Sequence, residues 1–110
     1  MIARLFFAVC ALALLTGPAP AQETFQTTTT IRNHKFEPAE IKVPANKKIM
    51  LKVINEDATS EEFHSDSLKT EKVIAGKGQA TIRFNGLKPG RYDFMGEYHE
   101  ATAKGALIAE

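Results

Sequence analysis

Hydrophobic and polar residues alternate along several short stretches of the chain. In residues 40–55 every second position is apolar on both sides of a turn, and residues 79–87 repeat the pattern. The apolar members of these two stretches are Ile41, Val43, Ile49, Leu51, Val53, Ala80, Ile82 and Phe84. Since a period of two places one set of side chains on one face, both stretches predict half-buried β-strands.

Turn-forming residues separate the predicted strands. Residues 44–47 divide the first stretch, because proline and asparagine favour turns and proline cannot serve a central ladder. A Pro-Gly turn at residues 89–90 leads into a strand with two aromatic residues on one face, and residues 105–110 form a last strand. The threonine-rich residues 24–36 also have the composition of a strand. About seven short strands in a chain of this length predict an all-β fold, a Greek-key β-sandwich.

Residues 1–21 have the features of a secretory signal peptide. Arg4 is followed by an apolar run and by Ala-Pro-Ala, which ends at Ala21. The apolar run is too short for a membrane-spanning helix, which needs about 20 residues, and no later segment is long or uncharged enough. We therefore expect cleavage after Ala21 and an exported, soluble mature chain of residues 22–110, which is enough for one domain.

Charge and cysteine content argue against several kinds of function. Without Arg4 the chain has 13 basic and 13 acidic residues, so nothing indicates a nucleic-acid surface. Cys10, the only cysteine, lies in the predicted signal peptide, which leaves the mature chain without a disulfide, a thiolate or a cysteine-based metal site. The sequence has no serine-nucleophile pattern and no phosphate loop, and we assign no catalytic residue. The acidic residues that gather in one short stretch and predict a locally negative end are Glu56, Asp57, Glu61, Glu62 and Asp66.

Three stretches give the chain a resemblance to the cupredoxin family. They are FEPAEIKVPANKKIMLKVIN at 36–55, LKPGRYDFMGEYH at 87–99 and KGALIAE at 104–110. The resemblance covers nearly all of the mature chain and implies a cupredoxin-like sandwich for residues 22–110. In that family one copper ligand, a histidine, follows an asparagine-containing turn after the third strand. A cysteine, a second histidine and a methionine lie in the loop between the last two strands.

This chain retains one of those four ligands. Asn55 and Asp57 supply the turn. The positions that correspond to the ligands are Glu61 for the first histidine, Gly96 for the cysteine, His99 for the second histidine, and Ala103 or Lys104 for the methionine. Because a blue-copper centre requires a copper–thiolate bond, we expect that this protein has no such centre. The simplest role for Gly96 is to permit a tight backbone turn.

Carboxylates gather near the positions of the lost ligands, at Glu61, Glu62, Glu97 and Glu100. Together with the stretches EEFHS, LKTEKVIAGKG and GEYHEATAKG, they resemble the cupredoxin-like domains of bacterial periplasmic iron-uptake systems. The resemblance implies a periplasmic protein that binds copper, iron or both. It would assist ferrous iron uptake by oxidising iron or by delivering it to an inner-membrane permease, with other periplasmic iron-uptake components as partners. Whether such a protein is an enzyme does not follow from the sequence.

The candidate metal ligands are Glu61, Glu62, Glu97 and His99, with Glu71 added from the family pattern alone. Carboxylate and imidazole ligands suit Cu(II), Fe or Mn, and Cu(II) binds most tightly at equal availability. Strand parity places Glu61 on the inward face of Phe63 and Glu62 on the opposite face. Either Glu61 or Glu62 could replace the lost ligand.

The alternative interpretation needs no metal. The carboxylates would then be solvated loop charges, and His99 would order its loop through a hydrogen bond. His34 and His64 are expected on the surface in either interpretation. The protein would be a metal-free β-sandwich interaction module that docks through its acidic pole onto a periplasmic partner.

Overall fold

Short strands joined by turns form the structure, a computed structural model that describes residues 23–110. The predicted signal peptide and its cleavage site lie outside the described residues. The elements in chain order are β1 (Phe25–Arg32), β2 (Lys35–Glu37), β3 (Glu40–Val43), β4 (Ile49–Asn55), β5 (Glu61–Ser65), β6 (Thr70–Ile74), β7 (Gln79–Phe84), β8 (Gly90–Gly96), the 3-10 helix η1 (Glu97–His99) and β9 (Lys104–Ala109). Within this part of the chain no helix has the length and apolar character needed to cross a membrane.

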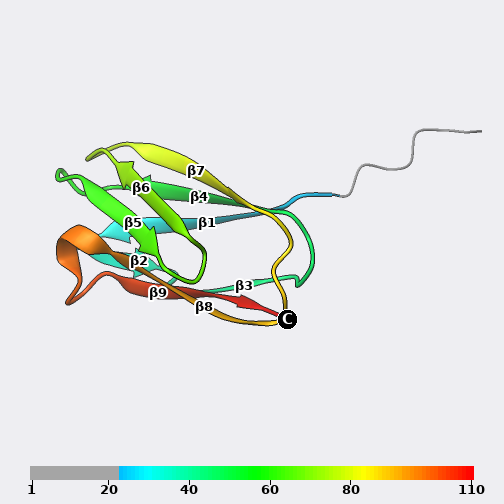
Figure 1. Cartoon of the computed structure of the whole chain (residues 1–110). Helices are drawn as coiled ribbons and strands as arrows, with labels where there is room; N and C mark the ends of the chain where they lie inside the picture. The colour runs from blue at the N-terminus through cyan, green and yellow to red at the C-terminus, as the bar shows by residue number, and fades with distance from the viewer. Residues whose placement is uncertain (1–22) are drawn as a thin grey trace, which may run out of the picture.

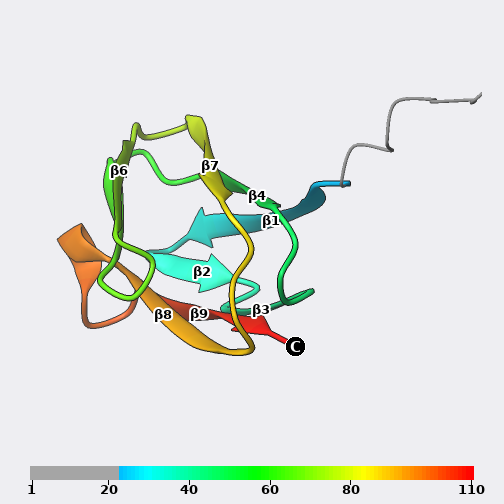
Figure 2. The same ribbon diagram turned by 45° about the vertical axis from the view of Figure 1, so that its right-hand side comes forward.

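The strands form two sheets that face each other, as Figures 1 and 2 show. One sheet has the order β2-β1-β4-β7 and the other the order β3-β9-β8-β5-β6. β1 runs parallel to β4 and β3 runs parallel to β9, whereas the other paired strands are antiparallel. The predicted all-β sandwich is therefore confirmed.

The apolar positions that alternate in the sequence form the core between the sheets. On β4 and β7, Ile49 lies opposite Phe84 and Leu51 lies opposite Ile82, and all four side chains are buried. The aromatic rings of Phe36, Phe63 and Phe94 pack together, with ring centroids 4.8 to 6.2 Å apart. Cross-strand apolar pairs and aromatic contacts of this kind are the main packing units of a sandwich.

The structure has more strands than the sequence predicted, because one predicted strand is two strands and part of the acidic stretch is also a strand. Residues 24–36 form two strands, since Asn33 and His34 both have positive φ angles, 52° and 57°, and make a tight hairpin turn between β1 and β2. Part of the acidic stretch forms β5, which pairs with β6. The described residues therefore contain nine strands where about seven were expected.

Three connections meet at one end of the sandwich, which we call the site pole. They are the β1–β2 turn at 33–34, the β4–β5 connection at 56–60 and the segment 97–103, which includes η1. This end lies at the left of Figure 1, and the C-terminus lies at the opposite end. Residues far apart in the sequence are thereby brought together at the pole.

Candidate metal centre

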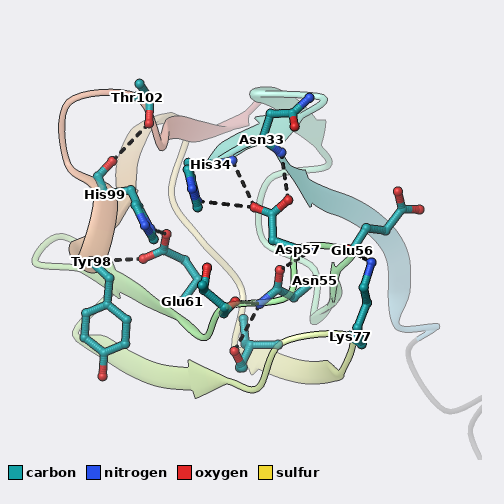
Figure 3. Close-up of polar contacts among 12 residues, drawn as sticks. Asn33, His34, Asn55, Glu56, Asp57, Glu61, Lys77, Tyr98, His99 and Thr102 are labelled. Carbon is teal, nitrogen blue, oxygen red and sulfur yellow. Dashed lines mark hydrogen bonds and ion pairs between the residues drawn. The ribbon is translucent and has the colours of Figure 1, made fainter.

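His34, Glu61 and His99 converge at the site pole, two from the converging segments and Glu61 directly after the β4–β5 connection. His34 lies in the β1–β2 turn, Glu61 begins β5 and His99 ends η1. One ligand atom from each side chain lies within 4.8 Å of the others. Figure 3 shows the two imidazole rings next to each other and the carboxylate of Glu61 beneath His99. We call these three residues the inner group.

Glu61 is the fixed member of the inner group. Its side chain is only 1% exposed. The carboxylate oxygen Oε1 accepts hydrogen bonds from the backbone N–H groups of Tyr98, at 2.9 Å, and Glu62, at 3.1 Å. Oε2 lies 2.5 Å from Nδ1 of His99. A buried carboxylate needs such partners, because burial without them is costly.

Gly96 makes room for this carboxylate. A Cβ atom at position 96 would lie 2.6 Å from Cδ of Glu61 and 2.7 Å from Cβ of Ala103, closer than real Cβ atoms approach. The φ angle of Gly96 is −90°, an ordinary extended value. The expectation that Gly96 serves a tight backbone turn is therefore wrong, and lack of space explains the glycine.

Ala103 is the residue that faces Gly96 across the loop. Its side chain is fully buried, whereas Lys104 is exposed. The loop is closed by hydrogen bonds from Gly96 N–H to the carbonyl of Ala103 and from Ala103 N–H to the carbonyl of His99, each 2.8 Å long. Of the two positions that could correspond to the family's methionine, Ala103 is the one that points inward.

His34 is held in the site by the turn that contains it. The carboxylate of Asp57 accepts hydrogen bonds from the backbone N–H groups of Asn33, at 2.8 Å, and His34, at 2.9 Å. The hydrogen bond from His34 is the largest cause that keeps the pKa of Asp57 below its ordinary value, and the bond from Asn33 acts in the same direction. The ring of His34 stacks on His99 with centroids 3.6 Å apart and an interplanar angle of 13°. Figure 3 shows the whole arrangement.

Asn55 anchors the β4–β5 connection that carries Asp57. The buried Asn55 amide donates hydrogen bonds to the carbonyls of Thr59, Ile74 and Ala75, at 2.9, 3.2 and 3.3 Å. Its side-chain oxygen accepts a 3.0 Å bond from the backbone N–H of Asp57. Asn55 and Asp57 therefore supply the turn, as the sequence predicted.

A second group of metal-ligating side chains lies on the other face of β5. It consists of Glu62, His64, Glu71 and Glu97, whose ligand atoms also lie within 4.8 Å of one another. We call it the outer group. Nδ1 of His64 lies 3.2 Å from Oε1 of Glu71 and 3.5 Å from Oε2 of Glu97.

Charge interactions in the outer group shift two pKa values. A hydrogen bond with Asp66, at 2.9 Å from Nε2, is the main cause that raises the pKa of His64, and nearby carboxylates add to it. The pKa of Glu62 is also raised, first by hydrogen bonding to Glu97 and then by burial and by the negative charges of Glu97 and Glu71. The outer group is therefore a centre of unbalanced negative charge.

The predicted ligands are thus divided between the two groups. Glu61 and His99 belong to the inner group, whereas Glu62, Glu71 and Glu97 belong to the outer group. The parity argument is confirmed, since β5 buries its odd-numbered residues and leaves the even-numbered ones partly exposed. The structure adds a histidine to each group, His34 to the inner and His64 to the outer. His34 keeps 42% of its side chain exposed, as expected of a surface residue, whereas His64 is more covered than expected, with 19% exposed. The available signal for His34 was the Asn-His pair between the Thr-rich residues 24–32 and the short stretch 35–37 that contains Phe36.

Nitrogen and oxygen donors of these types suit a first-row transition metal. The inner group offers one buried carboxylate and two imidazoles, a set that fits Cu(II), Fe or Zn. The Glu61 carboxylate fills the space beside Gly96, so both donor types in the inner group are nitrogen or oxygen. The chain's own residues therefore fit a metal ion without sulfur ligation.

Comparisons with known proteins agree with this description of the fold. The protein RP394 of Rickettsia prowazekii is 42% identical over 79 residues, which are 72% of this chain and 63% of that protein, so the chain spans less than two thirds of its relative.

Among solved structures, the "blue" copper protein auracyanin A of Chloroflexus aurantiacus matches with a TM-score of 0.68 at 11% identity, over 80% of this chain and all of the other. The metal-binding domain of the Streptococcus pneumoniae Cu(I)-exporting ATPase CopA has a TM-score of 0.66 at 14% identity, with 82% and 98% covered. The oxidized form of an amicyanin mutant matches with a TM-score of 0.61 at 16% identity, over 83% of this chain and 95% of the other. At such identities these structures show a shared fold. Residues 5–109 match the family described as "Cupredoxin-like domain", and the chain belongs to that family.

Proposed function

We propose that this protein is a periplasmic metal-binding protein that holds Cu(II) through His34, Glu61 and His99. Its role would be to assist ferrous iron uptake, by oxidising iron or by delivering it to an inner-membrane permease. The observation that carries the proposal is the buried carboxylate of Glu61, which contacts one imidazole while a second imidazole stacks on the first.

A cation would suit this arrangement electrostatically. Glu61 is almost fully buried, and its Oε2 faces His99, whose side chain is 27% exposed and therefore open to a metal that arrives from solvent. Burial makes a carboxylate charge costly even where hydrogen bonds are present, and a bound divalent ion would balance the charge. Among divalent ions of the first row, Cu(II) has the highest affinity for nitrogen and oxygen donors. Two structural neighbours are copper proteins as well: auracyanin A is a "blue" copper protein, and the metal-binding domain of CopA holds Cu(I).

The iron-uptake part of the proposal has different support. It comes from the resemblance of the stretches around Glu61, Glu71 and His99 to periplasmic iron-uptake domains. The predicted signal peptide agrees with a periplasmic location. Growth on limiting ferrous iron tests this part: cells without the gene should recover with the natural protein and not with His99→Gln. Equal recovery with both would contradict a role for the inner group in iron uptake.

One observation favours the second candidate, a metal-free interaction module. The Glu61 carboxylate already accepts hydrogen bonds from Tyr98 and Glu62 and contacts His99, so the pole is held together without an ion. In this alternative the inner group only stabilises the loops of the pole, and the acidic pole docks onto a periplasmic partner through its exposed charges.

Calorimetric titration of the purified protein with Cu(II) separates the two candidates. His99→Gln and Glu61→Gln should each weaken Cu(II) binding by at least about 10-fold, which corresponds to about 1.4 kcal/mol. Glu100→Gln is the matched control, because Glu100 is an exposed carboxylate next to His99 that belongs to neither group. Equal Cu(II) binding by the natural protein and both inner-group variants would overturn the metal proposal and favour the interaction module.

A further inference from the structure

The outer group is assembled by the register of three neighbouring segments. On β5, His64 pairs with Glu71 of β6 on one side and with Met95 of β8 on the other. Since alternate residues of a strand share a face, Glu62 lies on the same side of the sheet as His64. Glu97, two residues after Met95, completes the group at the start of η1. The sheet itself therefore brings the four side chains together.

His64 has the hydrogen-bond arrangement of a metal ligand. Its Nε2 lies 2.9 Å from Oδ1 of Asp66, so the ring donates that N–H and Nδ1 is left as the free nitrogen of the neutral ring. Metal-ligating histidines usually donate their second N–H to a carboxylate in this way, which fixes the tautomer. Asp66 therefore has the geometry of a residue that orients His64.

The free nitrogen is buried and has no hydrogen bond. Among the described residues 23–110, Nδ1 of His64 is the one buried side-chain nitrogen or oxygen atom that has no hydrogen-bond partner. Its nearest charged neighbours are carboxylate oxygens of Glu71 and Glu97, which accept hydrogen bonds and cannot donate them when ionised. A buried acceptor that faces two further acceptors is unsatisfied, and either a proton or a metal cation would satisfy it.

We propose that Glu62, His64, Glu71 and Glu97 form a second cation site, separate from the inner group and suited to a divalent ion of the Fe(II) and Mn(II) type. The inference rests on the proposed function in one respect, since it names this site as the place where the iron cargo binds. Three carboxylates and one imidazole form a harder donor set than one carboxylate and two imidazoles. Oxygen-rich sets suit Mn(II) and iron, whereas imidazole-rich sets favour Cu(II).

Exposure also fits a site from which the ion is released. The Glu71 side chain is 67% exposed and that of His64 is 19% exposed, so the ion would be held at the surface with one buried donor. The inner group, by contrast, is built around a carboxylate that is almost fully buried. Because neighbouring residues of a strand point to opposite faces, Glu61 and Glu62 would serve different sites.

Titration of the natural protein with Mn(II) chloride tests the second site, because Mn(II) resists oxidation during the measurement. Free Mn(II) is followed by electron paramagnetic resonance. His64→Gln and Glu71→Gln should each weaken Mn(II) binding by at least about 10-fold. His99→Gln and the exposed control Glu100→Gln should leave it within about 2-fold. Circular dichroism of each variant shows whether the fold is retained, and Glu71, being exposed, gives a variant whose folding is not at risk.

The outcomes separate this inference from the proposed function. No Mn(II) binding below about 1 mM, or binding that depends on His99 and not on His64, would overturn the second site. In either case Cu(II) binding that depends on His99 would leave the inner site standing. Conversely, Mn(II) binding that depends on His64 and Glu71 supports the second site even when Cu(II) binding proves insensitive to His99→Gln.

Discussion

The side chain of Glu61 occupies the space that a side chain at Gly96 would need. Cδ and Oε1 of Glu61 lie 2.6 and 2.8 Å from the place of a Cβ atom at position 96. The two positions therefore depend on each other: a residue other than glycine at 96 and the buried carboxylate at 61 cannot both be accommodated without movement.

Gly96→Ala should destabilise the protein by about 2 kcal/mol, within the usual range for overpacking a well-packed site. The added methyl would displace a carboxylate that is held by two backbone N–H groups and by His99. Chemical denaturation of the natural protein and the variant measures the loss. A cysteine side chain at position 96 would meet the same carboxylate, so Gly96→Cys alone should not create a blue-copper centre.

Glu61→Ala provides the control for this clash. In the double variant Gly96→Ala with Glu61→Ala, the new methyl no longer meets Cδ or Oε1, while the contact with Ala103 persists. The two substitutions should therefore be non-additive by at least about 0.5 kcal/mol, the double variant being more stable than the sum predicts. Strict additivity would show that Glu61 is not the obstacle.

Periodicity predicted most of the sandwich because its strands are amphipathic. The stretches at 49–55 and 79–84 are paired strands whose apolar faces form the core. Parity along β5 also placed Glu61 and Glu62 on opposite faces, as observed.

Local sequence patterns could not predict that the candidate ligands are divided between two groups. His34 was missed because 24–36 has the composition of one strand, and two consecutive positive φ angles, which periodicity does not reveal, turn the chain at Asn33. Glu97 and His99 were expected in one site, but they lie in η1. A 3-10 helix has three residues per turn, so residues two apart diverge, whereas in a strand they would share a face.

Asn55→Ala should cost about 2 to 3 kcal/mol of unfolding free energy. The substitution leaves three carbonyls and the Asp57 N–H without their partner in a largely buried place. Because Asp57 holds the turn that carries His34, we also expect weaker Cu(II) binding. Denaturation and calorimetry measure the two effects. Asn85→Ala, at an exposed asparagine, should change stability by no more than about 0.5 kcal/mol.

The copper-loaded protein should lack the intense visible absorption of a copper–thiolate bond. Cys10 is the only cysteine in the sequence, and the inner group offers only nitrogen and oxygen donors. Absorption spectroscopy of the Cu(II) form checks this. Cys10→Ser in the full chain should bind copper with the same affinity and give the same spectrum. A strong blue colour that vanishes with Cys10→Ser would reveal a thiolate ligand and contradict the assignment.

Without metal, the protein should become less stable as the pH rises above about 6.5. The pKa of His64 is raised above its ordinary value of 6.5, chiefly by the hydrogen bond to Asp66 and further by Glu97 and Glu71. The folded state therefore binds more protons than the unfolded state in the window above 6.5. The stabilisation that follows is complete below that value and is lost as the pH rises through the folded-state pKa.

Glu62 contributes in the same direction, because its pKa is raised as well and its protonated form is favoured in the folded state. Asp57 has a lowered pKa, so its contribution is lost only in acid, below the range tested. Urea denaturation in the presence of a chelator, at several pH values, gives the slope of the unfolding free energy against pH. His64→Gln should flatten it, since the group that takes up the proton is gone, whereas Glu100→Gln should preserve it. An unchanged slope in His64→Gln would mean that His64 is not the source of the pH dependence.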